Sequence, residues 1–423
     1  MGASALGLGY LLGPREHPQI TSQTVSATKS ATSYSSASAT STLNPTKLKQ
    51  GYPLLGNYDH WTWDIEPNQL ELFARWDRLA LNFETAHRST DALRHIRELN
   101  PNTKILAWIS LGYWDLNTSN QGYLGRKFLN SSTEAWWIHD KGTGDRIHLT
   151  SWYPDLVTPN PQTGFADHLL EFVHDDILST SLYDGVFYDG CGWDSGLAER
   201  LSNADVSISA YRLGITDILK RTRHNESGDV IILGNPGVQW DDDASYWDYA
   251  NGHYQENALG DVFGSNWNAM WKIYERNMMK RSPPPRFHWI GVDTQYKRKR
   301  PDYLNVTQQD LTADDLRRMR LGLGTTLLLD NGYFGFDKGD GWHGYGDQWG
   351  FPEYDAKLGF PSMKYEQDNG LYKRVFENGT VFVNSTNVGR TVQMSEKFKD
   401  ATSGSIGTVF LIDPMDSRIL MKS

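Results

Sequence analysis

Eight short β-type runs alternate with helical segments between residues 54 and 334, and this alternation constrains the fold more than any other feature. Such an alternation is typical of parallel βα units. Eight units spread over about 280 residues match a (β/α)8 barrel in number and length. The rival is an open doubly wound sheet, which usually carries a glycine-rich phosphate loop after its first strand, and no such loop is present. We therefore predict a (β/α)8 barrel.

The predicted elements follow from the hydrophobic pattern along the chain. Several helical segments carry apolar residues at i, i+3, i+4 and i+7, whereas the strand runs are short and rich in β-branched and aromatic residues. The predicted strands are 54–61, 78–85, 103–111, 184–190, 229–235, 252–257, 287–294 and 325–334. The predicted helices are 90–100, 164–178, 208–223, 267–280 and 312–324.

Polar and aromatic residues at the ends of these strands are candidates for the active site by position. Active sites of (β/α)8 barrels lie at the C-terminal ends of the strands, where the chain enters each βα loop. In strand order the candidates are Asp59, Trp61 and Trp63; Glu84; Tyr113 and Trp114; Asp189, Trp193 and Asp194; Asn235; Glu256; Asp293; and Asp330 with Asn331.

Two of these candidates have the chemistry that cleavage of a glycosidic bond requires. One carboxyl group must protonate the leaving oxygen, and the other must attack the sugar or activate water. We predict Asp189, at the end of DGVFYDG, as nucleophile and Glu256, at the end of GHYQEN, as acid/base. A helix cap at Asp189 and a substrate-binding or structural carboxylate at Glu256 are the alternatives. Asp194 and Glu84 are held in reserve, and Asp293 is a further possible acid, although we expect it and the remaining candidates to bind substrate.

Aromatic residues are abundant, with 16 Trp, 21 Tyr and 16 Phe, and many adjoin Gly, Asp, Asn or His. Flat apolar rings beside hydrogen-bonding groups suit sugars, although some of these rings must fill the core. The long segment GWHGYGDQWG after the predicted eighth strand has this composition, and long loops of this kind are usually functional. We expect Trp342, His343, Trp349 and Asp347 to line a sugar cleft, with a connector to the next domain as the alternative.

Three domains are predicted: a Ser/Thr-rich segment at 1–50, the barrel at 51–362 and a C-terminal module at 363–423. Beyond about Tyr365 the chain shows only alternating β runs and turns, including an Asn-Gly turn at Asn378. This pattern predicts a small antiparallel β-sandwich that packs against the barrel.

Charge and cysteine content exclude several classes of function. The formal net charge of −10 argues against nucleic acid as a partner, because phosphate binding needs clustered Lys and Arg. Cys191 is the single cysteine, and no Cys/His cluster has zinc spacing, so we predict no disulfide, metal or other cofactor. No apolar run is long enough to cross a bilayer.

The first fifty residues suggest export. Residues 1–14 are small and apolar and resemble the end of an export signal, although no basic segment precedes them, so a disordered N-terminus is the alternative. Residues 20–46 form a Ser/Thr/Ala-rich stalk. We predict an extracellular or envelope-associated protein. N-x-S/T sequons compatible with export occur at Asn117, Asn130, Asn225, Asn305, Asn378 and Asn384.

Three motifs resemble those of a known family: DGVFYDG (184–190), HYQEN (253–257) and the tail GLYKRVFENGTVFVNSTNVGRTV (370–392). Over residues 51–423 they are similar to a glycoside hydrolase family related to the α-galactosidase superfamily. That resemblance implies an Asp nucleophile on strand four, an acid/base on strand six, mostly retention of configuration, and a β-sandwich after the barrel. Phe187 stands where characterised α-galactosidases usually have Lys, and barrels that cleave poly-galactosamine are also similar, so the sugar stays open.

Four functions remain compatible with these residues. A retaining glycoside hydrolase is the first, and an inverting enzyme would use the same pair across a wider gap. A transglycosylase would share both carboxylates and transfer the sugar to another sugar in place of water. The rival from another class is a carbohydrate-binding protein on a degenerate barrel, in which the carboxylates only accept hydrogen bonds.

Overall fold

The computed structural model describes residues 51–150, 153–192, 199–226, 229–236, 248–256, 258–259, 267–279, 282–294, 306–338 and 346–423. The chain divides into the units Met1–Asn44 and Pro45–Ser423, and every described residue belongs to the second. The predicted stalk and export segment, Asn305, and the candidates Trp193, Asp194, Trp342 and His343 lie outside the described residues.

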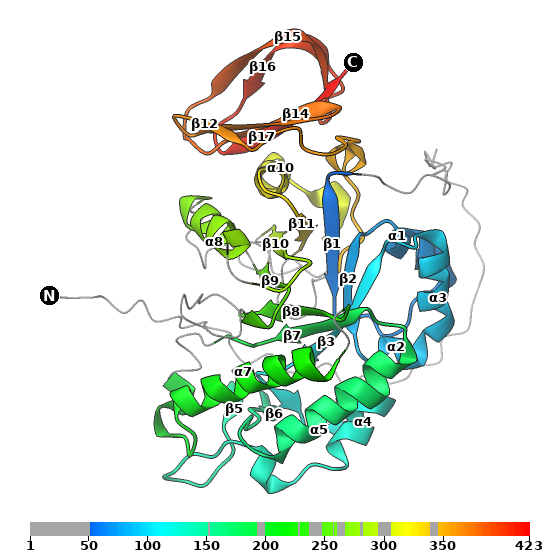
Figure 1. The fold of residues 1–423 in the computed structure, drawn as a ribbon, viewed down its shortest axis with the longest axis vertical. Helices are drawn as coiled ribbons and strands as arrows, with labels where there is room; N and C mark the ends of the chain where they lie inside the picture. Colours follow the sequence, from blue (N-terminus) through cyan, green and yellow to red (C-terminus); the bar gives the residue numbers. More distant parts are fainter. Residues whose placement is uncertain are drawn as a thin grey trace, which may run out of the picture. The chain divides into compact units, whose positions relative to one another are not determined.

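Eight parallel strands form a closed barrel, which confirms the predicted fold class (Figure 1). The strands pair in chain order, and β1 pairs with β11 to close the ring, with Leu54 opposite Tyr333. The barrel strands are β1 (Leu54–Asp59), β2 (Arg78–Asn82), β3 (Lys104–Ser110), β7 (Gly185–Asp189), β8 (Ile231–Asn235), β9 (Gly252–Gln255), β10 (Phe287–Asp293) and β11 (Gly332–Asp337).

Helices follow the strands on the outside of the barrel, as amphipathic patterns predict. In α3, Leu93 and Ile96 face the core, and in α10 a capping box between Thr312 and Asp315 fixes the first turn. The helices are α1 (Leu70–Ala74), α2 (Thr85–Arg88), α3 (Thr90–Leu99), α4 (Tyr123–Leu129), α5 (Gly164–Phe172), α7 (Ile208–Asn225), α8 (Trp267–Met279) and α10 (Ala313–Thr326). Between β3 and α5 a small antiparallel sheet contains β4 (Trp114–Asp115), β5 (His148–Thr150) and β6 (Tyr153–Val157).

The predicted eighth strand, 325–334, is wrong in its position. The hydroxyls of Thr325 and Thr326 donate to the carbonyls of Leu321 and Leu323, so both threonines complete the last turn of α10. The strand begins only at Gly332 and ends at Asp337. A short apolar run such as TTLLL has no periodicity that separates a buried helix end from a strand, and here the helix continues through it.

Large aromatic side chains fill the interior of the barrel. Trp289 of β10 is fully buried, and a Cβ at Gly56 of β1 would lie 2.4 Å from its ring. Tyr58, Phe187 and Tyr254 pack against one another with edge-to-face ring contacts of 4.8–5.6 Å, and Tyr254 contacts the Trp289 ring at 5.4 Å. The interior is therefore a packed core, and only residues at the strand ends can meet a substrate.

The C-terminal strands form one antiparallel sheet in the order β12-β13-β14-β17-β15-β16. β14 is buried along its whole length because Val381 and Val383 join the main core while Phe382 joins a second core within the sheet. The strands are β12 (Glu366–Asp368), β13 (Leu371–Phe376), β14 (Gly379–Asn384), β15 (Arg390–Asp400), β16 (Ile406–Ile412) and β17 (Asp416–Lys422).

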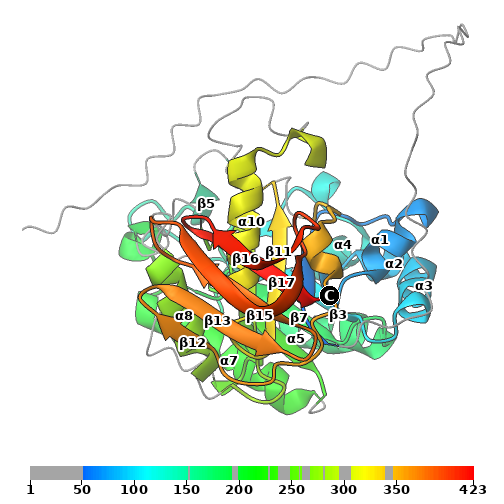
Figure 2. The same cartoon turned by 90° about the horizontal axis from the view of Figure 1, so that it is seen from above.

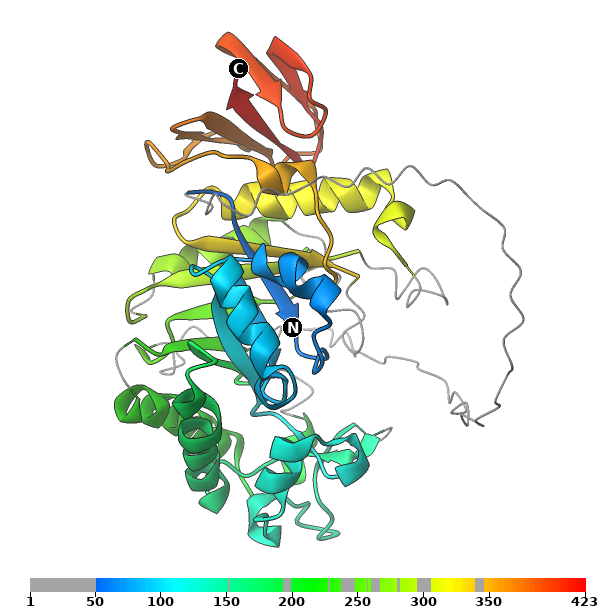
Figure 3. The ribbon, with the colours of Figure 1, turned by 90° about the vertical axis from the view of Figure 1, so that its right-hand side faces the viewer.

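This sheet packs on α10 (Figures 2 and 3). Gly324 permits the close approach, since a Cβ there would lie 2.4 Å from the side chain of Ser417. Arg320 of α10 and Asp416 of β17 form a paired hydrogen bond at 2.9 Å and 2.7 Å, with side chains 13% and 1% exposed. The C-terminal sheet and the barrel thus share a buried ion pair as well as apolar surface.

Removing one partner of this pair tests its contribution to stability. Arg320→Ala removes two charge-assisted donors from the buried Asp416, which keeps Arg418 at 2.9 Å, and we expect it to lower the free energy of unfolding by about 2 kcal/mol. Urea unfolding measures this change. Arg94→Ala is the matched control, because the Arg94–Asp91 pair is 63% and 98% exposed and should be worth little. Equal effects of the two substitutions would contradict the proposed role of the Arg320 pair.

Candidate active site

Asp189 ends β7, the fourth strand of the barrel, and four hydrogen-bond donors surround its carboxylate. The backbone N–H of Gly190 and Nδ2 of Asn235 donate to Oδ1 at 2.9 Å and 2.7 Å. Trp108 Nε1 and the Tyr58 hydroxyl donate to Oδ2 at 3.2 Å and 3.5 Å. These donors come from β1, β3, β8 and the residue after Asp189, so barrel closure assembles the whole environment. All four donors stabilise the ionised carboxylate.

Glu256, directly after β9, lies beside Asp189. Nδ2 of Asn235 also donates to Glu256 Oε2 at 2.9 Å. Because the two bonds share one nitrogen, Asp189 Oδ1 and Glu256 Oε2 are separated by at most the sum of 2.7 Å and 2.9 Å, or about 5.6 Å. The structure thus brings the two predicted catalytic carboxylates together. Asn235, which we expected to bind substrate, lies between them and contacts both.

Burial and mutual repulsion dominate the electrostatics of the pair. Burial is the main cause that raises the pKa of Asp189 to about 7, and the charge of Glu256 adds to it, while the hydrogen bonds from Trp108, Gly190 and Asn235 act in the opposite direction. Burial also raises the pKa of the Tyr58 and Tyr113 hydroxyls, and both carboxylates reinforce that rise. The tyrosines therefore stay neutral and serve as hydrogen-bonding groups.

Sequence reasoning missed Tyr58 and Trp108, although a signal for both was present. Each lies near the end of its strand at a position whose side chain points into the barrel, and Trp108 is two residues before Ser110, which pairs with Asp189. From Trp108 the rings continue outward, first to His60 at 4.6 Å and then to Trp61 at 4.8 Å. Trp61 is 43% exposed, as expected for a ring that could contact a sugar.

Asp59 ends β1 and is buried under the segment that follows β11. It accepts the backbone N–H of Thr62 at 3.1 Å, and Gly346 packs so closely that a Cβ there would lie 2.3 Å from its carboxyl carbon. Burial raises the pKa of Asp59 to about 7. Asp347 belongs to the same segment and is held by Lys338, whose Nζ lies 3.2 Å from its carboxylate. The segment with Gly346 and Asp347, which we expected to line a sugar cleft, thus contacts the rim of the barrel at Asp59 and Lys338.

Two further carboxylates lie at the ends of neighbouring strands. Asp293 ends β10, pairs in register with Asp337 of β11, and lies 3.6 Å from the guanidinium of Arg318. Arg318 also donates to the backbone carbonyl of Asp293. Asp337 was not predicted, because the eighth strand was placed too early in the sequence.

Asp330 and Asn331 are the first correction to the predicted site. They precede β11 and so lie at the N-terminal end of that strand, opposite the catalytic rim. Asp330 pairs with Arg374 of the C-terminal sheet, and the N–H of Asn331 donates to the Tyr52 hydroxyl at 2.8 Å. Their predicted place at the rim is wrong for the same reason as the predicted eighth strand.

Trp114 and Trp349 are core residues, so the prediction that their rings face a sugar is wrong. Trp114 is 4% exposed and stacks on Phe128 at 4.1 Å. Trp349 is 7% exposed and packs against Phe336 at 5.8 Å. Both lie next to loop-type residues in the sequence, but their rings fill the space between the barrel and its outer elements.

Glu84 has a structural contact in place of the predicted exposure to substrate. Its side chain is 1% exposed, and Oε1 accepts the backbone N–H of Gly125 at 2.6 Å in the first turn of α4. A carboxylate at this position satisfies helix donors that have no partner within the helix. Trp63 also contacts a protein side chain, because the Arg88 guanidinium lies 5.5 Å from the centre of its ring.

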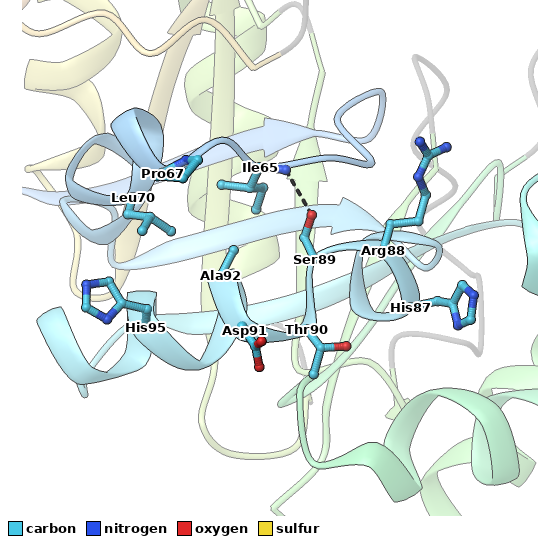
Figure 4. Close-up of a pocket in the computed structure, with 10 residues that line it drawn as sticks. All are labelled: Ile65, Pro67, Leu70, His87, Arg88, Ser89, Thr90, Asp91, Ala92 and His95. Carbon is cyan, nitrogen blue, oxygen red and sulfur yellow. Dashed lines mark hydrogen bonds between the residues drawn. The ribbon is translucent and has the colours of Figure 1, made fainter.

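A surface hollow of about 580 Å³ has a lining that includes neither Asp189 nor Glu256. Figure 4 shows the residues that line it. None of its ten lining residues belongs to a barrel strand; they come from the segment after β1 and from α1, α2 and α3. Ser89 in its wall is already bonded to the N–H of Ile65 at 2.9 Å. The candidate active site is therefore the rim of the barrel that carries Asp189 and Glu256, and not this hollow.

Within the residues that the structure describes, no group of three His, Cys, Asp or Glu side chains could hold a metal ion. None of the helices of the described part is long and apolar enough to cross a bilayer.

Comparison with known proteins gives one family and several distant structures. The family described as hypothetical glycosyl hydrolase family 15 (GHL15) matches residues 97–380. No curated protein matches the chain. The GH31 dextranase of Flavobacterium johnsoniae in complex with glucose is 11% identical with a TM-score of 0.49, over 87% of this chain and 51% of the dextranase. The isomalto-dextranase of Arthrobacter globiformis T6 in complex with panose is 10% identical with a TM-score of 0.45, over 89% and 75%. The chain thus spans about half the length of the dextranase.

The raised pKa of Asp59 predicts a pH-dependent effect on stability. The pKa of this carboxyl is about 7 in the folded protein and 3.8 in the unfolded chain. The folded state therefore loses stability as the pH rises from 3.8 to 7, because the buried carboxyl must ionise. Asp59→Asn removes that loss. We expect the variant to gain roughly 2–3 kcal/mol relative to wild type between pH 5 and pH 8, measured by urea unfolding. Asp91→Asn, at a fully solvated position, is the control. A difference from wild type that stays constant with pH would refute the prediction.

Proposed function

Because the chain belongs to the hypothetical glycosyl hydrolase family 15, we propose that it is a retaining glycoside hydrolase that acts on a poly- or oligosaccharide. In this proposal Asp189 is the nucleophile and Glu256 the acid/base. Both roles rest on the position of the two carboxylates at the ends of the fourth and sixth strands, on either side of β8, and on the donors that surround Asp189.

One observation carries the choice of a retaining mechanism. Retaining glycosidases hold their two carboxyl groups about 5–5.5 Å apart, whereas inverting enzymes need about 6.5–9.5 Å to admit a water molecule. The shared contact with Asn235 limits the separation of Asp189 Oδ1 and Glu256 Oε2 to about 5.6 Å. This limit applies to the two oxygen atoms that Asn235 contacts, and it favours the shorter spacing of a retaining enzyme over the wider gap of an inverting one.

The first step forms a covalent intermediate. Asp189 attacks the anomeric carbon, the bond between that carbon and the leaving oxygen breaks, and Glu256 transfers its proton to that oxygen. Oδ2 of Asp189 suits the attack, because its donors, Trp108 and Tyr58, lie at 3.2 Å and 3.5 Å, whereas Oδ1 is held more tightly at 2.7 Å and 2.9 Å.

The second step returns the enzyme to its starting state. Water attacks the anomeric carbon from the side that the leaving group vacated, and its proton passes to Glu256. The ester bond to Asp189 breaks and its electron pair returns to the carboxylate. Trp108, Tyr58, Gly190 and Asn235 then receive the restored negative charge with their four hydrogen bonds.

We further propose a relation to the α-galactosidase superfamily, on the basis of the nucleophile on strand four and the acid/base on strand six. Galactose itself is not part of the proposal. The position of the usual Lys is taken by Phe187, which is fully buried in the barrel interior and contacts Tyr58 and Tyr254.

Asp189→Asn tests the nucleophile directly. We expect turnover to fall by about 10⁴-fold or more, because the amide cannot attack, while substrate binding persists. Activity is measured on a panel of 4-nitrophenyl glycosides and soluble polysaccharides, and binding by calorimetry on the best of these. Proton NMR of the first product formed by the wild type should show retained configuration. Full activity in the variant would eliminate Asp189 as nucleophile.

Azide separates the two proposed roles. In Asp189→Gly an azide ion can attack from the vacated position and give a glycosyl azide of inverted configuration. In Glu256→Ala azide should attack the covalent intermediate and give the retained product. The opposite pattern would exchange the two assignments, and no azide product from either variant would argue against a covalent mechanism.

We also propose that the chain is exported, as the composition of residues 1–50 suggested. Asn130, Asn225 and Asn378 are exposed and could accept glycans, whereas Asn384 is fully buried and donates to three backbone carbonyls. Expression of the full chain in a eukaryotic secretory host should give a product in the medium that loses mass with an N-glycanase. Retention of the chain inside the cells without glycans would contradict export.

A further inference from the structure

Asn235 occupies an unusual position in the candidate site. It ends β8, pairs in register with Asp189, and its carbonyl accepts the N–H of Cys191 at 3.1 Å, so the backbone is fixed on both sides. The side chain is 1% exposed. Its single amide nitrogen bonds to Asp189 Oδ1 at 2.7 Å and to Glu256 Oε2 at 2.9 Å.

The chemistry of an amide explains why this residue type suits the position. A primary amide nitrogen carries two N–H donors and no charge, so it can bond to two carboxylates at once. An aspartate at the same place would add a third acceptor and repel both groups. A lysine would neutralise the pair and lower the nucleophilicity of Asp189. The amide donates to both carboxyl groups at once without adding a charge of its own.

We propose that Asn235 is a positioning residue that sets the gap between the two carboxylates and selects the oxygen atom with which Asp189 attacks. This inference rests on the proposed function. The amide engages Oδ1 of Asp189 and Oε2 of Glu256. Asp189 Oδ2, which accepts from Trp108 and Tyr58 at 3.2 Å and 3.5 Å, is then the oxygen that attacks the sugar.

The hydrogen bond from Asn235 lowers the pKa of Asp189, so its contribution can be measured by titrating that carboxyl group. The titratable groups that face the carboxylate are Tyr58 from β1, Tyr113 after β3, Cys191 after β7, and Tyr254 and Glu256 from β9 and the residue that follows it. The tyrosine and cysteine groups have raised pKa values and remain neutral near pH 7. Among these groups Glu256 raises the pKa of Asp189 most, whereas the hydrogen bond from Asn235 lowers it.

The indole of Trp108 reports this titration without any substrate. Its Nε1–H donates to Asp189 Oδ2, so its NMR signal in protein labelled with ¹⁵N-tryptophan should move as Asp189 ionises. Trp108→Phe identifies the signal among the 16 tryptophans. In the wild type we expect a midpoint near pH 7.

Substitutions on either side of Asp189 should move the midpoint in opposite directions. Asn235→Ala removes a donor to the ionised form, so the midpoint should rise by about one pH unit. Glu256→Gln removes the nearby charge and should lower it. If Asn235→Ala does not fold, Asn235→Ser takes its place in the same titration. Asn82→Ala is the matched control, because Asn82 is a buried residue that also ends a barrel strand, yet it bonds to the His60 carbonyl and not to either carboxylate.

Kinetics complete the experiment on whichever glycoside the wild type cleaves. Asn235→Ala should lower kcat by about 10–100-fold with a smaller change in KM, and shift the acidic limb of the pH profile upward with the NMR midpoint. A midpoint and kcat equal to those of wild type would overturn the positioning role. An active Asp189→Asn variant would instead overturn the proposed function, so the two failures are distinguishable.

Discussion

The parallel pairing of β1 with β11 is the contact on which the rest of the molecule depends. It closes the sheet, and closure places the C-terminal ends of all eight strands on one rim. Asp189 comes from the fourth strand, Glu256 follows the sixth, and Tyr58 comes from the first, yet all three share one small polar region. An open sheet would separate β1 from β9 by the width of several strands. The carboxylate environment is therefore a consequence of topology as much as of residue type.

The same rim concentrates charge in a poorly hydrated region, which is unfavourable for folding. Burial raises the pKa of both Asp59 and Asp189 to about 7, so each ionised carboxylate costs stability at neutral pH. The aromatic interior beneath the rim and the shared core with the C-terminal sheet offset this cost. Such a division of labour, in which a well-packed scaffold supports a strained polar site, is common in enzymes.

The positions of the candidate site residues were predicted correctly where the strand ends were correct, and wrongly where a side chain could face either of two surfaces. The ends of the fourth, fifth and sixth strands were placed correctly, and the structure brings Asp189, Asn235 and Glu256 together. Glu84 also ends a strand, but its carboxylate turns to the first turn of α4. Trp114 has neighbours that are typical of a sugar site, and yet it packs on Phe128 in the core. Residue type and local position do not determine which of two nearby surfaces a side chain covers.

The sequence by itself determined the alternation of strands and helices, because hydrophobic periodicity and chain length leave few other ways to bury eight short apolar runs. It also determined that a carboxylate stands at the end of the fourth strand and another after the sixth. Only the tertiary structure decided that one amide joins them and that Trp108 and Tyr58 complete the environment of Asp189. It also moved the eighth strand to Gly332–Asp337 and so removed Asp330 from the rim. The hydrogen bonds to Asp189 join residues up to 131 positions apart, and such contacts leave no periodic trace in the local sequence.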